Sequence, residues 1–77
     1  MMELERFVKD FANQLDETDP ETVTASTVYK DLDEWSSFLA LAIMAMIKSE
    51  YDVAVNAQEM RDAQTIQDLF NVVQSHV

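Results

Sequence analysis

The feature that most restricts how this chain can fold is an uninterrupted run of ten apolar residues, from Phe38 to Ile47. The run is about half as long as a membrane-spanning helix needs, so it predicts a helix of a soluble domain. A small bundle cannot cover a helix that is apolar on every side. We therefore expect a helix over Ser37–Glu50 with part of its apolar surface facing outward. The candidates for these outward positions are Leu39, Ala40, Ala42, Met44 and Met46.

A first helix is predicted over Glu3–Leu15, where apolar residues recur at helical spacing. Pro20 and the polar residues before it end this helix, since proline cannot continue the hydrogen-bond ladder. The pattern from Asp16 to Trp35 is irregular and predicts a long ordered loop, which needs contacts with the core to stay in place. The apolar residues that could anchor the loop are Val23, Val28, Tyr29 and Leu32.

Two capping-box patterns predict the remaining helices. Asn56 with Glu59 predicts a short helix, and Thr65 with Asp68 predicts a last one. We expect these helices over Ala57–Asp62 and Thr65–Ser75.

Together these elements predict an all-α fold in a single domain over residues 1–77. It is a small four-helix bundle of three main helices and one short helix, with a long loop between the first two. Apolar residues at helical spacing are the usual way in which such a bundle builds its core. The candidate core residues are Phe7, Phe11, Leu41, Met44, Ile47, Ile66 and Phe70.

The charge of the chain is strongly one-sided. Fifteen acids against five lysines and arginines give a net charge of −10. This balance disfavours nucleic acid and anionic membranes as partners and favours proteins with basic docking surfaces. The chain has no cysteine and no pattern of a secretory signal, which fits a reducing compartment. We expect a cytoplasmic monomer.

The composition also excludes several kinds of catalytic and binding site. Dinucleotide fingerprints, P-loops and EF-hands need glycine at fixed positions, and this chain has none. The single histidine, His76, lies at the C-terminal end, so neither a metal cluster nor a Ser-His-Asp triad can be assembled. We therefore expect no metal site and no enzyme activity.

The junction Trp35-Ser36-Ser37-Phe38 places two hydroxyl groups at the start of the apolar helix. The first turn of a helix has unpaired N–H groups and the positive end of the helix dipole, which suit a phosphate esterified to a serine. The alternative is that Ser36 or Ser37 only caps the helix, since serine is among the preferred N-cap residues.

The chain resembles the acyl carrier protein family over almost its whole length. The segment Val23–Leu32 is similar to the loop before that family's attachment site, and Trp35-Ser36-Ser37-Phe38 is similar to its Trp-Asp-Ser-Leu motif. Ile47–Val53 is similar to the end of the family's second helix, and Thr65–Leu69 to the start of its last one. The chain has Ser36 where the family motif has aspartate.

The resemblance implies that a phosphopantetheinyl transferase attaches 4′-phosphopantetheine from coenzyme A to Ser37. The arm would carry an acyl group as a thioester to enzymes of fatty-acid, polyketide or related biosynthesis. Ser36 is the less favoured attachment site, because choosing it displaces every later motif position by one. The residues implied in docking to basic partner surfaces are Asp31, Asp33, Glu34, Phe38, Glu50 and Asp52.

Two alternatives stay open. One is an aminoacyl or peptidyl carrier, which shares the arm but not the cargo. The other is an unmodified carrier-like module that binds a partner through the outward apolar face of the second helix, for which Ser36 in the motif and the run from Phe38 to Ile47 are the reasons.

Overall fold

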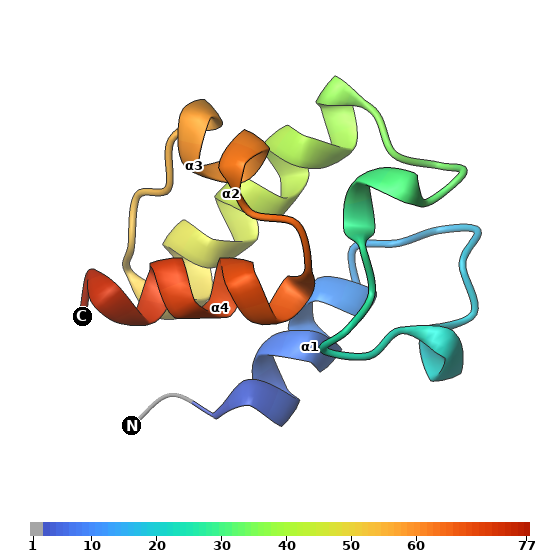
Figure 1. Cartoon of the computed structure of the whole chain (residues 1–77), viewed down its shortest axis with the longest axis horizontal. Coiled ribbons are helices and arrows are strands. Elements are labelled where there is room, and N and C mark those ends of the chain that lie inside the picture. The colour runs from blue at the N-terminus through green and yellow to red at the C-terminus, as the bar shows by residue number, and fades with distance from the viewer. Residues whose placement is uncertain (1–2) are drawn as a thin grey trace.

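The computed structural model describes residues 3–77 and shows an all-α fold (Figure 1). Over these residues the chain forms four α-helices and two single-turn 3-10 helices, and no strand. This confirms the predicted fold class and the division into three longer helices and one short helix. The elements are α1 (Leu4–Ala12), η1 (Pro20–Thr22), η2 (Tyr29–Asp31), α2 (Ser37–Tyr51), α3 (Ala57–Asp62) and α4 (Ile66–Ser75).

The helix bounds follow the sequence signals closely except in α1. The helix α3 has the predicted bounds, and α2 ends one residue later than predicted, at Tyr51. The helix α1 ends at Ala12 instead of Leu15, and the backbone continues through two tight turns that still bury Leu15. The apolar spacing indicated burial correctly, but turns can also bury a residue, so the helix was predicted too long.

Both predicted capping boxes are present. The Asn56 side chain accepts from the Glu59 backbone N–H at 2.8 Å, and the Glu59 side chain accepts in return from the Asn56 N–H at 3.1 Å. Thr65 and Asp68 form the same reciprocal pair at the start of α4. These bonds satisfy helix-end donors locally, which is why a signal of four residues was enough to find them.

The core lies where α1 meets α2 and α4. The helix α1 packs against both of these helices, and α3 packs against α4 (Figure 1). Phe7 of α1 contacts Phe70 of α4 with a ring separation of 5.6 Å and an edge-on geometry that aromatic pairs favour. The fully buried residues of this core are Phe7, Phe11, Tyr29, Ile43, Ile47, Ile66, Leu69 and Val73.

The apolar run of α2 buries one stripe. Leu39, Ile43, Met46 and Ile47 are buried, at the spacing of one helix face. The prediction that Leu39 and Met46 could face outward is therefore wrong, whereas Ala40, Ala42 and Met44 are half-buried.

The outward face of α2 begins at its first turn. Phe38 is 82% exposed and Leu41 is 62% exposed, so the prediction that Leu41 belongs to the core is also wrong. An all-apolar run gives no clue to the rotation of its helix, because burying any face would satisfy the pattern equally well.

The long segment between α1 and α2 is anchored chiefly by Tyr29. Its ring is fully buried, and its hydroxyl donates to the carbonyl oxygens of Met60 at 2.6 Å and Ala63 at 3.2 Å. Val23 is buried as predicted, but the Val28 side chain is 37% exposed. Val28 instead forms an isolated backbone bridge with Thr65, so this part of the segment is held by hydrogen bonds.

Candidate functional site

The two serines at the start of α2 have different surroundings. Ser36 is the N-cap residue, with an extended backbone, and its Oγ accepts a hydrogen bond from the Leu39 N–H at 3.1 Å. Ser37 is the first residue of the helix and is exposed. Among residues 3–77, no hydrogen bond uses the Ser37 hydroxyl. The two interpretations of this junction, a helix cap and an exposed hydroxyl that could be modified, therefore apply to different residues. Ser36 caps the helix, and Ser37 has a free, exposed hydroxyl.

The position of Ser37 suits a phosphate ester. The backbone N–H groups of Ser37 and Phe38 have no partner among the described residues, as is usual in the first turn of a helix. These donors and the helix dipole favour a negative group near the Ser37 Oγ. A phosphopantetheine group would fit here because an exposed hydroxyl leaves room for an arm of any length to extend into solvent.

An open groove of about 560 Å³ adjoins the serines. Its apolar lining comes from Ala40, Leu41 and Met44 of α2 and from Ala57 and Met60 of α3. The groove therefore lies between two helices that are joined by a short connection, and it can receive apolar chemical groups.

The remaining lining of this groove is polar or amphipathic. It consists of Trp35, both serines, Lys30 from η2 and Arg61 from α3. Neither Lys30 nor Arg61 was predicted as a site residue, because no local pattern indicates that residues so far apart in the chain share a groove. The capping box before α3 predicted where that helix begins but not which of its faces would turn toward Ser37.

The predicted docking carboxylates are spread over two regions. Asp31 and Asp33 are exposed on the segment that leads to Ser37. Glu50 lies at the far end of α2 and pairs with Arg6 at 3.3 Å. Asp52 pairs with Lys48 at 3.1 Å and ends α2 in the left-handed region, with φ at 56°, in a chain that has no glycine for that position. Their docking role stays a prediction.

Glu34, a further predicted docking residue, makes its contacts inside the chain. One carboxylate oxygen accepts from the Asp16 N–H at 2.9 Å, and the other accepts from the Glu17 N–H at 3.0 Å and from the Thr18 hydroxyl. These bonds hold the turn after α1 against the residues that precede Ser36. The Thr18 hydrogen bond is the main reason that the pKa of Glu34 lies below its ordinary value, and the backbone bonds add to it.

We expect Glu34→Gln to destabilise the fold at neutral pH, because an amide has one acceptor oxygen where three donors are now satisfied. A carboxyl with a depressed folded-state pKa contributes stability above its unfolded pKa and loses it as pH falls through the folded pKa. The difference in the free energy of unfolding between wild type and variant should therefore be largest at pH 7. It should shrink as the pH falls below about 4.5, the ordinary pKa of a glutamate side chain. Denaturant unfolding at several pH values measures it.

Asp33→Asn is the matched control for this prediction, since Asp33 is an exposed neighbouring acid. It should leave the stability nearly unchanged at every pH. An equal effect of the two substitutions would contradict the role of the Glu34 hydrogen bonds.

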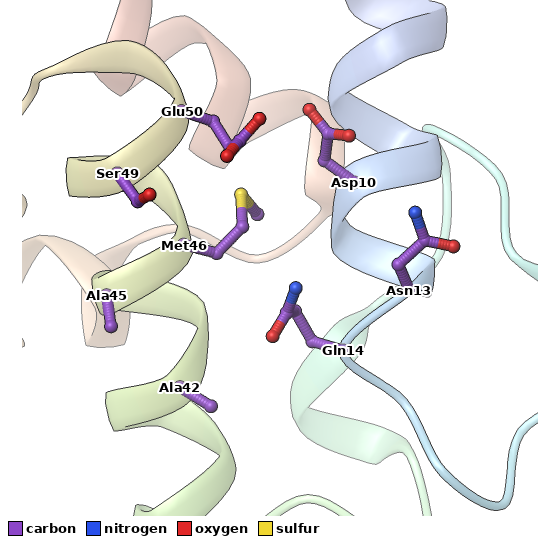
Figure 2. A pocket seen from close by; sticks show the side chains of 8 residues that line it. All are labelled: Asp10, Asn13, Gln14, Ala42, Ala45, Met46, Ser49 and Glu50. Carbon is purple, nitrogen blue, oxygen red and sulfur yellow. The ribbon is translucent and has the colours of Figure 1, made fainter.

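A second groove, of about 570 Å³, lies between α1 and α2 (Figure 2). Asp10 and Glu50 lie at one end of it, with the Met46 side chain between the helices and Ala42 toward the other end. Arg6 pairs with both of these carboxylates. This groove does not include Ser37, and its charged groups already have partners, so we do not assign the chemistry of the site to it.

Tyr51 adds to the same network at the end of α2. Its hydroxyl donates to the Asp10 carboxylate at 2.7 Å, which links α1 to α2. Burial raises the pKa of Tyr51 above its ordinary value, and the hydrogen bond to Asp10 raises it further. The phenol therefore remains a donor at any physiological pH.

Scans of the chain against family models, curated proteins and solved structures return no match. Within residues 3–77, no helix is both long and apolar enough to cross a membrane. The same residues contain no group of three or more histidine, cysteine or acidic side chains placed to hold a metal ion.

Proposed function

We propose that this protein is an acyl carrier protein that carries 4′-phosphopantetheine on the Ser37 Oγ. The observation that supports the assignment is the difference between the two serines: the Ser36 hydroxyl is used in capping, while that of Ser37 is exposed and has no partner among residues 3–77. The order of helices and the motif around Ser37 are similar to those of the carrier family. When bound, the arm supplies the thiol that holds an acyl group as a thioester.

The residues of the chain have three tasks in this function. The Ser37 hydroxyl oxygen attacks the phosphate next to the pantetheine of coenzyme A, the pyrophosphate bond breaks, and adenosine 3′,5′-bisphosphate leaves. A base on the transferase takes the hydroxyl proton, since the single histidine of the chain, His76, pairs with Glu59. The N–H groups of the first helical turn stabilise the added negative charge. Phe38 and the exposed acids Asp31 and Asp33 are the surface that we expect basic partner enzymes to contact.

The test is the intact mass of the purified protein after incubation with coenzyme A and a broad-specificity phosphopantetheinyl transferase. We expect an increase by one phosphopantetheine group, since Ser37 lies at an exposed helix start. A known carrier protein treated in the same way shows that the transferase is active. An unchanged mass beside a fully modified control would contradict the proposal.

A second function is favoured by the exposed apolar face of α2. Phe38 is 82% exposed and Leu41 is 62% exposed, and neighbouring exposed apolar residues often mark a binding surface. On this alternative the protein is an unmodified interaction module. An unchanged mass in the transferase experiment, together with a cellular role that survives Ser37→Ala, would favour it. Modification with an amino acid as cargo would instead indicate an aminoacyl or peptidyl carrier.

A further inference from the structure

The groove between α1 and α2 has its charge at one end. The Asp10 and Glu50 carboxylates face each other across that end, one from each helix (Figure 2). The apolar residues of the lining, Met46, Ala45 and Ala42, follow Glu50 along α2. From Glu50 to Ala42 the helix advances by about 12 Å, at about 1.5 Å per residue. The groove of about 570 Å³ is therefore an elongated surface, negative at one end and partly apolar along its length.

The two carboxylates share a single cation. The Arg6 guanidinium lies 3.5 Å from the Asp10 carboxylate and 3.3 Å from that of Glu50. The Arg6 side chain is 61% exposed, and ion pairs of exposed side chains contribute little because water and salt screen them. The pair of carboxylates therefore keeps a net negative charge, and another cation can replace the guanidinium at little cost.

Amide side chains border the groove away from the carboxylates. Asn13 and Gln14 contribute them from the end of α1, and the Gln14 side chain points toward α2 (Figure 2). Within residues 3–77, neither side-chain amide forms a hydrogen bond. An amide oxygen accepts a hydrogen bond from an ammonium group. This part of the groove can therefore receive a second cationic group without a second acid.

These features fit a linear molecule with a positive charge at each end and hydrocarbon between. The net charge of −10 attracts cations to the whole chain, and the groove adds an apolar contact that an inorganic cation cannot use. We propose that the groove binds an aliphatic diamine, with one ammonium between Asp10 and Glu50 and its methylene chain against Met46. The second ammonium donates to the Gln14 amide oxygen. The groove does not include Ser37, so this proposal goes beyond the proposed function.

The experiment titrates the unmodified protein with 1,8-diaminooctane and, in parallel, with octylamine, which has the same chain and a single ammonium group. Isothermal titration calorimetry at physiological ionic strength measures both affinities. We expect saturable binding of the diamine at one site per chain. It should bind about three- to tenfold more tightly than octylamine, as one additional, partly exposed polar contact would produce.

The double variant Asp10→Asn and Glu50→Gln removes both carboxylate charges but keeps oxygens that can accept hydrogen bonds, including the one from the Tyr51 hydroxyl. It should weaken diamine binding by about three- to tenfold. The matched control, Asp31→Asn and Asp33→Asn, removes the same charge from exposed positions outside the groove and should bind the diamine as the wild type does. An equal loss in both double variants, or the absence of saturable binding, would overturn the proposal.

Arg6→Gln gives a second test with the opposite expected sign. It removes the cation that the ligand displaces, so it should tighten diamine binding by about two- to fivefold. Lys9→Gln is the matched control, because it removes the same charge from an exposed position of α1 outside the groove and should leave the affinity nearly unchanged. Weaker binding to Arg6→Gln would contradict the displacement and overturn the proposal. Ser37→Ala should bind the diamine normally, so the result is independent of the transferase experiment.

Discussion

Ser37→Ala is expected to abolish the phosphopantetheine mass increase completely. The substitution removes the only exposed serine hydroxyl of the first helical turn that is free of hydrogen bonds among residues 3–77. Ser37 is the first residue of α2 and does not serve as its cap, and alanine is an excellent helix former, so the fold should be unaffected. Intact mass measures the loss, and the far-ultraviolet circular dichroism spectrum shows whether the variant is folded.

Ser36→Ala is the matched control, because it removes a hydroxyl one residue away. It should keep the mass increase but lower the free energy of unfolding by about 1 kcal/mol, since it removes the side-chain cap that accepts from the Leu39 N–H. The two neighbouring variants thus have opposite expected effects. Loss of the increment in folded Ser36→Ala, with its retention in Ser37→Ala, would contradict the assignment of the site.

Tyr29→Ala is expected to destabilise the fold by about 3 to 5 kcal/mol, the usual cost of truncating a large buried aromatic residue. The ring is fully buried and packs against Phe11 at 5.6 Å and Trp35 at 5.0 Å between ring centres. A chain of 77 residues typically has a total stability of only about 4 to 12 kcal/mol. The variant should therefore be partly or largely unfolded at room temperature, which denaturant unfolding followed by circular dichroism would measure.

Tyr29→Phe separates the contribution of the hydroxyl from that of the ring. It should lower the free energy of unfolding by about 1 to 3 kcal/mol, because the buried carbonyl oxygens of Met60 and Ala63 lose their shared donor. Burial, with a further contribution from Asp68, raises the pKa of Tyr29 to about 12, so this donor persists at all ordinary pH values. A cost below 1 kcal/mol for Tyr29→Ala would contradict the anchoring role of this residue.

This anchor connects the stability of the fold to the candidate site. The segment that contains Tyr29 leads directly to Trp35 and the two serines, and Met60, which accepts from the Tyr29 hydroxyl, also lines the groove beside Ser37. Loss of the Tyr29 contacts should therefore loosen the groove as well as the core. The position of Ser37 at the end of this segment depends on contacts that bridge the chain from η2 to α3.

Features that depend on a few consecutive residues could be predicted from the sequence alone. The bounds of α3, the start of α2 and both capping boxes follow from hydrogen bonds and backbone preferences within one helical turn. The buried residues of α1 were recognisable because its apolar stripe is flanked by charged positions. Two hydroxyl groups at the start of the apolar helix were likewise visible as a candidate site.

Three features depend on tertiary packing: which face of α2 is buried, which serine hydroxyl is free, and which distant side chains meet beside it. The run from Phe38 to Ile47 carries no polar residue that marks its outer side, so packing against α1 and the rest of the core sets its rotation. Lys30 and Arg61 meet because η2 packs on the end of α3. Such contacts join segments about thirty residues apart, and no periodicity within a single helix can encode them.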